Sequence, residues 1–251
     1  MKGLKLIFFS LFFFLTGCAS TGNNAGSDQE TSAENKDDPW ENWNRGVYSF
    51  NKVMDENIAK PATNVYKAIT PDFMETGFSN VFSNLGDVSN MVNNLLQGKL
   101  LDSLSDLGRL VVNSTFGVGG LFDFASDMGM TKHDEDFGQT LGAWGVGSGP
   151  YMMLPFIGPS TLRDTAALPA DSKTDPVNQT EHIPTRNTAL TFELLDKRAG
   201  LMQYEDALKD VIDEYAFIRD IYLQNRKYKV LDGELPLDEE CEEGFEEDCE
   251  F

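Results

Sequence analysis

The sequence predicts an all-α protein of short amphipathic helices with a Gly- and Pro-rich segment near its centre. Large apolar residues recur at alternating spacings of three and four over much of the chain, which is the pattern of one helix face. Glycines and prolines interrupt these stripes at short intervals, and the sequence shows no convincing run of strands and no internal repeat. With 251 residues, of which 41% are hydrophobic, the chain is long enough to bury a core.

Residues 1–17 have the features of a bacterial signal peptide. A short basic start precedes Leu6–Leu15, an apolar run interrupted only by Ser10. Ten helical residues reach about 15 Å and the hydrocarbon core of a bilayer is about 30 Å thick, so this run is too short to span a membrane. The residues Leu15-Thr16-Gly17-Cys18 resemble a lipobox, in which Cys18 is lipidated and becomes the N-terminus. The alternative is an ordinary signal peptide with an incidental cysteine.

Residues 18–37 are expected to form the lipidated cysteine and a polar tether. In the lipoprotein class that this motif resembles, Asp directly after the cysteine retains the protein at the inner membrane. Ala19 occupies this position here, which favours the outer membrane. The rest of the segment contains only small or polar residues, which is typical of a flexible linker. We therefore expect a lipid anchor at Cys18 that holds a folded body at the membrane.

A helical domain is expected over residues 38–231, with Asp38 as the first N-cap and Pro39 at the first helical position. Four apolar stripes at helical spacing are Trp43, Val47, Phe50 and Met54; Met74, Phe78, Val81 and Leu85; Val88, Met91, Val92, Leu95 and Leu96; and Leu100, Leu104, Leu107 and Val111. Breaks between helices are expected at Pro61, Pro71, Gly86, Gly98 and Gly117.

The stripes by themselves favour packing into a core over contact with a membrane. The membrane alternative rests on the large aromatic residues near the breaks, because a Phe-rich amphipathic helix on a tethered protein can lie in the bilayer interface. These helices are not basic, so apolar burial would have to drive such binding. The aromatic residues concerned are Phe73, Phe78, Phe82, Phe116, Phe122 and Phe124.

The Gly- and Pro-rich segment covers residues 137–164 and is the main candidate for a functional site. Its glycines and prolines prevent a long helix, and its large apolar residues are unusual for an exposed loop. Irregular backbone of this kind is tolerated at membrane depth where it lines a watery passage. Two interpretations of the segment remain open: it forms the wall or rim of a channel, or it is a buried connector between helices. The candidate channel residues are Phe137, Gly138, Gly142, Gly145, Gly147, Gly149, Pro150, Tyr151, Pro155, Arg163 and Asp164. A side chain at Gly147 is expected to crowd the backbone.

The last part of the chain is expected to hold one long surface helix and an acidic tail. The helix stripe consists of Leu201, Tyr204, Leu208, Val211, Tyr215, Ile218 and Tyr222. Residues 232–251 contain eleven acidic side chains and no Lys or Arg, about half of the formal net charge of −21. In an oxidising periplasm, Cys241 and Cys249 are expected to form a disulfide. This composition is compatible with a compact acidic group that contacts a partner protein, and equally with a solvated tail.

Composition and motifs exclude several other functions. The negative net charge argues against general nucleic-acid binding, which needs clustered Lys and Arg. The chain lacks a complete dinucleotide or phosphate-binding glycine motif and a nucleophile elbow. His133 stands among acidic residues and is interpreted as part of a solvated polar turn, with no EF-hand spacing nearby. The sequence therefore indicates no catalytic residue, no metal site and no cofactor, and a lipid hydrolase is scarcely supported.

With the lipobox, residues 38–228 resemble the MlaA family of outer-membrane lipoproteins, also called VacJ. The residues that carry the resemblance are Asp38-Pro39, Glu41, Asn44, Arg45, Phe50-Asn51, Asp55, Asn80, Asn84-Leu85, Asn93, Leu96-Gln97-Gly98, Arg109, Asn113-Ser114-Thr115, Gly117-Val118-Gly119-Gly120, Asp123, Phe137-Gly138-Gln139-Thr140-Leu141-Gly142, Gly145-Val146-Gly147, Gly149-Pro150-Tyr151, Leu154-Pro155, Arg163-Asp164 and the segment Glu193–Arg198. The resemblance implies a ring of helices set in the inner leaflet of the outer membrane, with a central amphipathic channel. It reverses the preference for core packing, because several stripes would then face lipid.

The resemblance also implies a function. Such proteins remove phospholipid from the outer leaflet of the outer membrane, associate with trimeric porins and pass lipid to a periplasmic carrier, MlaC, to keep the membrane asymmetric. They are not enzymes, and no cofactor is implied. The polar segment 165–187 and the acidic tail depart from the family pattern. The alternative function is a structural or adhesive surface lipoprotein without transport activity.

Overall fold

A computed structural model describes residues 37–234 of the chain. The chain divides into two units, residues 1–34 and 35–251, and all described residues belong to the second. The predictions for Cys18, Cys241 and Cys249 lie outside the described residues.

The described residues are mostly helical, which confirms the predicted class apart from one short hairpin. The elements in chain order are α2 (Glu41–Met54), the π-helix η2 (Asp55–Ala59), α3 (Lys60–Ile69), α4 (Asp72–Leu96), α5 (Leu100–Thr115), α6 (Phe124–Asp127), α7 (Phe137–Ala143), β1 (Tyr151–Leu154), β2 (Gly158–Thr161), α8 (Leu162–Thr174), α9 (Ile183–Leu201), the 3₁₀-helix η3 (Met202–Tyr204), α10 (Glu205–Leu208) and α11 (Glu214–Val230).

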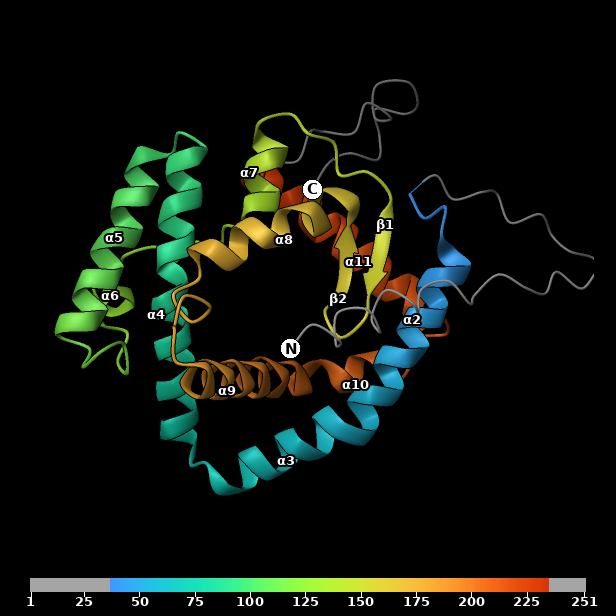
Figure 1. The fold of residues 1–251 in the computed structure, drawn as a ribbon, viewed down its shortest axis with the longest axis horizontal. Coiled ribbons are helices and arrows are strands. Elements are labelled where there is room, and N and C mark those ends of the chain that lie inside the picture. The colour runs from blue at the N-terminus through green and yellow to red at the C-terminus, as the bar shows by residue number, and fades with distance from the viewer. Residues whose placement is uncertain (1–36, 235–251) are drawn as a thin grey trace, which may run out of the picture. The chain divides into compact units, whose positions relative to one another are not determined.

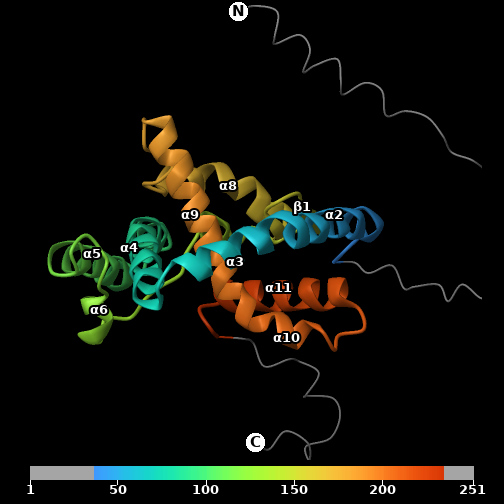
Figure 2. The same cartoon turned by 90° about the horizontal axis from the view of Figure 1, so that it is seen from below.

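The contacts between these elements close a circuit (Figure 1). Helix α2 continues through η2 into α3, α4 follows α3 and contacts α8, α8 contacts β2, and the partner strand β1 contacts α2 again. Helix α9 crosses inside the circuit and contacts both α3 and α4. In the view of Figure 2, α8 lies on one side of the α2–α3 rod and α11 lies on the other.

The two strands form an antiparallel hairpin inside the Gly- and Pro-rich segment, where no strand was predicted. Tyr151 pairs with Thr161 and Leu154 pairs with Gly158. Asn44 and Asn51 on α2 stabilise the free edge of β1: Asn44 donates to the Tyr151 carbonyl and accepts from Met153 N, and Asn51 donates to the Leu154 carbonyl. These asparagines are seven residues apart and therefore lie on one helix face, so side-chain amides replace the missing third strand.

Replacing Asn44 by Ala should lower the free energy of unfolding by about 3 kcal/mol. The substitution leaves the buried Tyr151 carbonyl and Met153 amide without these bonds, and each unsatisfied buried group costs about 1–3 kcal/mol. Thermal unfolding followed by circular dichroism measures the effect, with Asn57→Ala as the matched control because Asn57 bonds only within its own helix. Equal melting temperatures of the two variants would contradict the role given to Asn44.

Helix boundaries differ from the prediction at Pro61 and Gly86. Pro61 does not separate two helices, because the backbone stays helical from η2 into α3, whose first turn contains Pro61. Gly86 lies inside α4, which continues for 25 residues. Gly98, at φ +83°, does follow the end of α4 as predicted, since only glycine adopts this backbone conformation easily.

The first and last predicted helices also need correction. Asp38 does not cap α2; it is buried and accepts hydrogen bonds from Asn44 Nδ2 at 2.8 Å and Tyr215 Oη at 2.5 Å. The predicted helix from Leu201 to Tyr222 is broken before α11. Helix α11 begins after Asp213, because the Asp213 side chain caps it by accepting from Ala216 N. The same side chain binds Arg45 of α2 at 2.6 Å.

The packing of α4 and α5 is inverted relative to a soluble protein. Ser103, Asp106 and Arg109 of α5 are buried against α4, and Asn113 is buried against the start of α6. The four leucine and valine residues of the predicted fourth stripe are all exposed, at 41–62% of their surface, as is the neighbouring Leu101 at 82%. The stripe therefore does not pack into a core, which its residues alone favoured, and its side chains face outward, as the family resemblance implied.

The same inversion extends over the rest of the described chain. Nineteen polar or charged residues are buried in residues 37–234, compared with nine apolar ones. The small apolar core contains Val47, Tyr151, Met153 and Tyr215, at the junction of α2, β1 and α11. Soluble proteins normally bury apolar residues and expose charged ones. In residues 37–234, no helix is long and apolar enough to cross a membrane.

Candidate functional site

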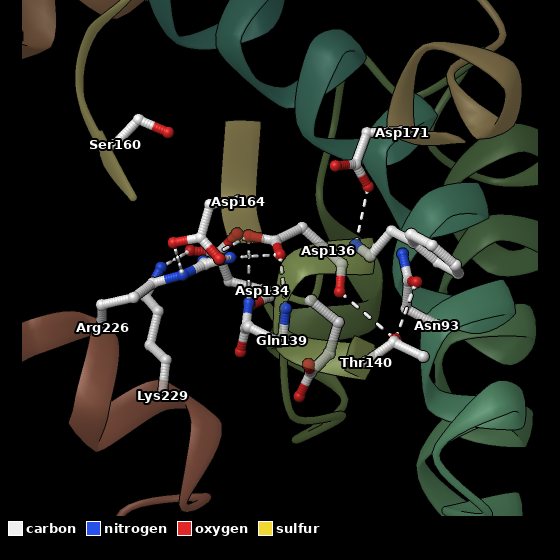
Figure 3. A network of polar contacts seen from close by, with 12 residues as sticks. Asn93, Asp134, Asp136, Gln139, Thr140, Ser160, Asp164, Asp171, Arg226 and Lys229 are labelled. Atoms are coloured by element: carbon white, nitrogen blue, oxygen red, sulfur yellow. Dashed lines mark hydrogen bonds and ion pairs between the residues drawn. The ribbon is translucent and has the colours of Figure 1, made fainter. Parts of the chain in front are cut away.

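Four charged side chains form a largely buried junction between α7, α8 and α11, and Figure 3 labels three of them, Asp136, Asp164 and Arg226. Arg226 of α11 donates to both carboxylate oxygens of Asp136 at 2.5 Å and to both oxygens of Asp164 at 2.8 and 3.0 Å. Arg163 also donates to Asp164, at 3.0 Å. We call Asp136, Arg163, Asp164 and Arg226 the charged junction. It holds three segments that are far apart in sequence in one fixed arrangement.

Two glycines of α7 allow the charged junction to close. A Cβ atom at Gly138 would lie 2.4 Å from Arg226 Nη2 and 2.5 Å from Asp164 Oδ1. A Cβ atom at Gly142 would lie 2.7 Å from a methyl group of Val230 and 2.8 Å from Arg163 Nη1. The charged groups and α11 therefore pack directly on the α7 backbone, and this close approach requires glycine at both positions.

The charged junction lowers the pKa of both of its carboxyl groups. Burial by itself raises the pKa of Asp136 and of Asp164, but the hydrogen bonds and the positive charge of Arg226 outweigh it. A carboxyl group whose pKa is lowered on folding stabilises the protein above its unfolded pKa of about 3.9. That contribution is lost as the pH falls through the folded-state pKa.

The remaining candidate residues do not join this junction. Tyr151 is fully buried in the aromatic core and contacts the rings of Tyr215 and Tyr222. Pro155 lies in the hairpin turn and the Pro150 carbonyl accepts from Leu162 N. Gly145 and Gly149 have positive φ angles, so they shape the loop between α7 and β1. Phe137 packs edge-to-face against Trp144, and its amide donates to Asp171 at 2.7 Å.

Gly147 lacks the crowding that the sequence suggested. A Cβ atom there would meet nothing within 4 Å, and its φ is not in the left-handed region. The close approach that we expected at Gly147 occurs at Gly138 and Gly142 instead.

A second polar cluster lies between α4, α5 and the segment that precedes α7. Arg109 is 1% exposed and binds Asp123 at 3.0 Å, and the buried Asp87 accepts from Lys132. His133 is not in a solvated turn: its Nδ1 lies 2.7 Å from Oδ1 of the fully buried Asp106. This cluster replaces an apolar core between the two helices.

The stability that Asp123 contributes should disappear in acid. Burial opposes its ionisation, but hydrogen bonds from Ser126 and Asn113 and the charge of Arg109 outweigh burial and lower the pKa of Asp123 to about 2. Wild type should therefore melt higher than Asp123→Asn at pH 5, and the difference should close between pH 4 and pH 2. The control is Asp127→Asn. A difference that stays constant over this range would contradict the assignment.

Two cavities lie along the inner side of α4. The first, of about 540 Å³, is lined by Phe78 and Phe82 of α4 and by Phe192 and the first turns of α9. The second, of about 370 Å³, also includes Phe82 and continues to α8, and two of its lining residues are Asp136 and Asp171. The charged junction thus forms part of a cavity wall through Asp136. Residues 37–234 contain no group of three or more His, Cys, Asp or Glu side chains placed to hold a metal ion.

Sequence reasoning missed Asp136, Asp171 and Arg226 as site residues. The polar stripe along α4 was also overlooked, although it was visible: Asn84, Asp87, Asn90 and Asn94 follow at spacings of three and four. When the apolar stripe of a helix is exposed, the polar stripe on its other side faces the neighbouring helix, and the space between the two helices is polar. Arg226 carried no local signal, because its partners are 62 and 90 residues away.

A helical frame with polar residues inside and apolar residues outside defines a membrane-associated protein. The chain belongs to the MlaA lipoprotein family, whose sequence model matches residues 36–229. It is 34% identical over 226 residues to the "Intermembrane phospholipid transport system lipoprotein MlaA" of Escherichia coli and to that of Shigella flexneri, covering 88% of this chain and 86% of each relative. A solved structure from work on the "Structural basis for maintenance of bacterial outer membrane lipid asymmetry" matches with a TM-score of 0.69 and 31% identity, covering 77% of this chain and 98% of that one.

Proposed function

We propose that this protein is the outer-membrane lipoprotein of an intermembrane phospholipid transport system. It removes phospholipid from the outer leaflet of the outer membrane and passes it towards the periplasm, which keeps the membrane asymmetric. Its relatives with assigned names are phospholipid transport lipoproteins and not enzymes, and the non-enzymatic role of this chain is part of the proposal.

The observation that carries the proposal is the inverted packing. Large apolar side chains on the outer faces of α4 and α5 remain exposed while nineteen polar or charged residues are buried. Water would make this arrangement unfavourable, since each Å² of exposed apolar surface costs about 25 cal/mol. Lipid chains around the frame remove that cost. A body that lies in one leaflet needs no spanning helix.

The interior supplies a polar route beside an apolar one. A phospholipid must keep its head group solvated or paired while its acyl chains stay away from water. The cavities along α4 offer aromatic walls at Phe78, Phe82 and Phe192 and charged walls at Asp136 and Asp171. We propose that the segment from α7 to β2 forms the rim of this passage and that the charged junction keeps the rim in place.

The partners belong to the same proposal. A trimeric porin holds the body in the outer membrane, and a periplasmic lipid carrier of the MlaC kind receives the phospholipid. The lipid anchor at Cys18 and the tether over residues 18–37 keep the body at the inner leaflet.

The direct test is the amount of phospholipid in the outer leaflet of a deletion strain. The proposal expects it to rise when the protein is absent and to return to normal when the wild-type chain is supplied from a plasmid. A deletion strain with unchanged outer-leaflet phospholipid would contradict transport and would favour a structural role.

Replacing Cys18 by Ala should abolish acylation and impair transport. No other cysteine in the chain follows a lipobox. Metabolic labelling with radioactive palmitate should label the wild type and leave the variant unlabelled, and label on the variant would contradict the anchor. Part of the variant should still sediment with membranes, because the apolar outer face remains.

The acidic tail carries a separate proposal. Cys241 and Cys249 pair as a disulfide in the periplasm, which gathers the surrounding carboxylates into a compact acidic group. Mass spectrometry under non-reducing conditions tests the pairing, and two free thiols would contradict it.

A further inference from the structure

The two cavities along α4 differ in chemistry and meet at one residue. Phe82 lines both of them. The larger one has walls of Phe78, Phe82, Phe192 and Ala189 and is almost entirely apolar; we call it the apolar cavity. The smaller one is lined by four carboxylates and one lysine and is called the acidic cavity; these residues are Asp136, Asp171, Asp175, Glu193 and Lys197.

The charges of the acidic cavity do not balance. Asp136 is neutralised by Arg226 in the charged junction, and Glu193 accepts from Lys197 at 2.6 Å. Asp171 accepts only from the Phe137 amide, and Asp175 accepts from Val177 N and from the Asn178 side chain. No ion pair is formed by Asp171 or Asp175 within residues 37–234. Two carboxylates therefore line this cavity without a cation in direct contact.

The surroundings of Asp171 make a cation favourable at this point. Burial raises the pKa of the Asp171 carboxyl and the negative charge of Asp136 adds to the rise, while the Phe137 amide and the positive charge of Arg226 offset part of it. A positive group in the cavity would relieve both effects. Lys197 cannot supply it as placed, because it is bound to Glu193 and its side chain is 70% exposed. An anionic group at the cavity mouth would instead share this exposed ammonium group with Glu193.

We infer that the two cavities together select a zwitterionic phospholipid with a primary ammonium head group. One acyl chain lies in the apolar cavity against Phe78, Phe82 and Phe192. The ammonium group lies between Asp171 and Asp175, and the phosphate meets Lys197. The inference rests on the proposed function and adds to it a preference for ethanolamine-type over anionic glycerol-type head groups.

Charge and continuity both support this occupant. An apolar ligand would leave the carboxylates unpaired, and a free cation would leave the aromatic walls of the apolar cavity exposed. An anionic lipid would bring a negative charge to an already negative cavity. A lipid with a positive terminal group matches the apolar walls of one cavity and the negative charge of the other. The two cavities are neighbours, because Phe82 lines both of them.

The test uses the full acylated protein in detergent micelles. It is offered an equimolar mixture of phosphatidylethanolamine and phosphatidylglycerol with identical acyl chains, and the bound lipids are quantified by mass spectrometry after gel filtration. Wild type should retain about five-fold more ethanolamine lipid, the size expected of a partly screened ion pair. The double variant Asp171→Asn with Asp175→Asn keeps the hydrogen-bond acceptors and should lower the ratio to about one. Its matched control, Asp206→Asn with Asp210→Asn, removes two charges from exposed positions and should keep the wild-type ratio.

A second measurement leaves the protein unchanged. N-acetylated phosphatidylethanolamine lacks the positive charge, so wild type should bind it no better than phosphatidylglycerol. Equal binding of the two natural lipids by wild type, or a preference that survives the double substitution, would overturn the head-group inference alone. Failure to retain any phospholipid would overturn the inference and count against the proposed transport function as well.

Discussion

Replacing Arg226 by Met should lower the free energy of unfolding by about 3–5 kcal/mol, the largest effect expected for a single substitution in this protein. Arg226 compensates Asp136 and Asp164 at once, and removing one partner of a buried ion pair leaves uncompensated buried charge. Because Met keeps the length and most of the volume of the side chain, the loss reports on charge and hydrogen bonding more than on packing. Denaturant or thermal unfolding in mild detergent gives the measurement.

Lys227→Met is the matched control for this prediction. It makes the same chemical change one residue further along α11, at a position that forms no ion pair within residues 37–234, and should alter stability by less than about 0.5 kcal/mol. A second variant separates the charge effect from helix docking: Arg226→Met combined with Asp136→Asn should recover part of the loss, because Asp136 has no other ion-pair partner, whereas Asp164 keeps Arg163. If Arg226→Met and Lys227→Met unfold alike, the charged junction does not hold α7, α8 and α11 together.

Replacing Leu101 and Leu104 together by Asp should release the unacylated body from the membrane. Both side chains are exposed on the outer face of α5, at 82% and 62%, and neither supports the protein interior. A charged residue placed in the hydrocarbon costs about 2.5–3.5 kcal/mol at the centre of the bilayer, so two of them cost several kcal/mol even nearer the interface. The experiment is carried out in the Cys18→Ala background, where the lipid anchor does not mask the effect.

The readout is the fraction of protein that sediments with membrane vesicles. The body with its native α5 should sediment in large part, and the doubly substituted body should move to the supernatant with its circular dichroism spectrum unchanged. Asn187→Asp with Gln203→Asp adds two equal charges at exposed polar positions of α9 and η3 and should sediment like the parent. Equal sedimentation of all three proteins would mean that the outer face of α5 does not contact lipid.

The sequence predicted that the first half is helical, because apolar stripes are local features, but it placed breaks at Pro61 and Gly86 where the helices continue. The break at Gly98, at the end of α4, was predicted correctly, since its positive φ is a property of a few neighbouring residues. The direction in which a stripe faces is not local. Leu100, Leu104, Leu107 and Val111 repeat as they would in a soluble helix, and only the polar stripe on the other side of α5, buried against α4, shows that they point outward.

The hairpin and the charged junction could not be found in the same way. Strands β1 and β2 have four residues each, β2 contains Pro159, and β1 depends on the side chains of Asn44 and Asn51 from more than 100 residues away. The family resemblance included Gly138, Gly142, Arg163 and Asp164 among eleven candidate residues without separating them from the others. The physical reason that links these four, close packing of α7 around Arg226, needed the position of α11.

The outward orientation of α5 is the central claim, and a spin label at position 104 tests it most directly. The label is attached to Leu104→Cys in the acylated chain with Cys241 and Cys249 replaced by Ser, and the protein is placed in phospholipid vesicles. A reference label at Gln203→Cys reports on a polar exposed position. We predict that the label at position 104 collides frequently with lipid-dissolved oxygen and rarely with a water-soluble nickel chelate, with the opposite pattern at position 203. Equal access of the nickel chelate to both positions would contradict a lipid-facing α5.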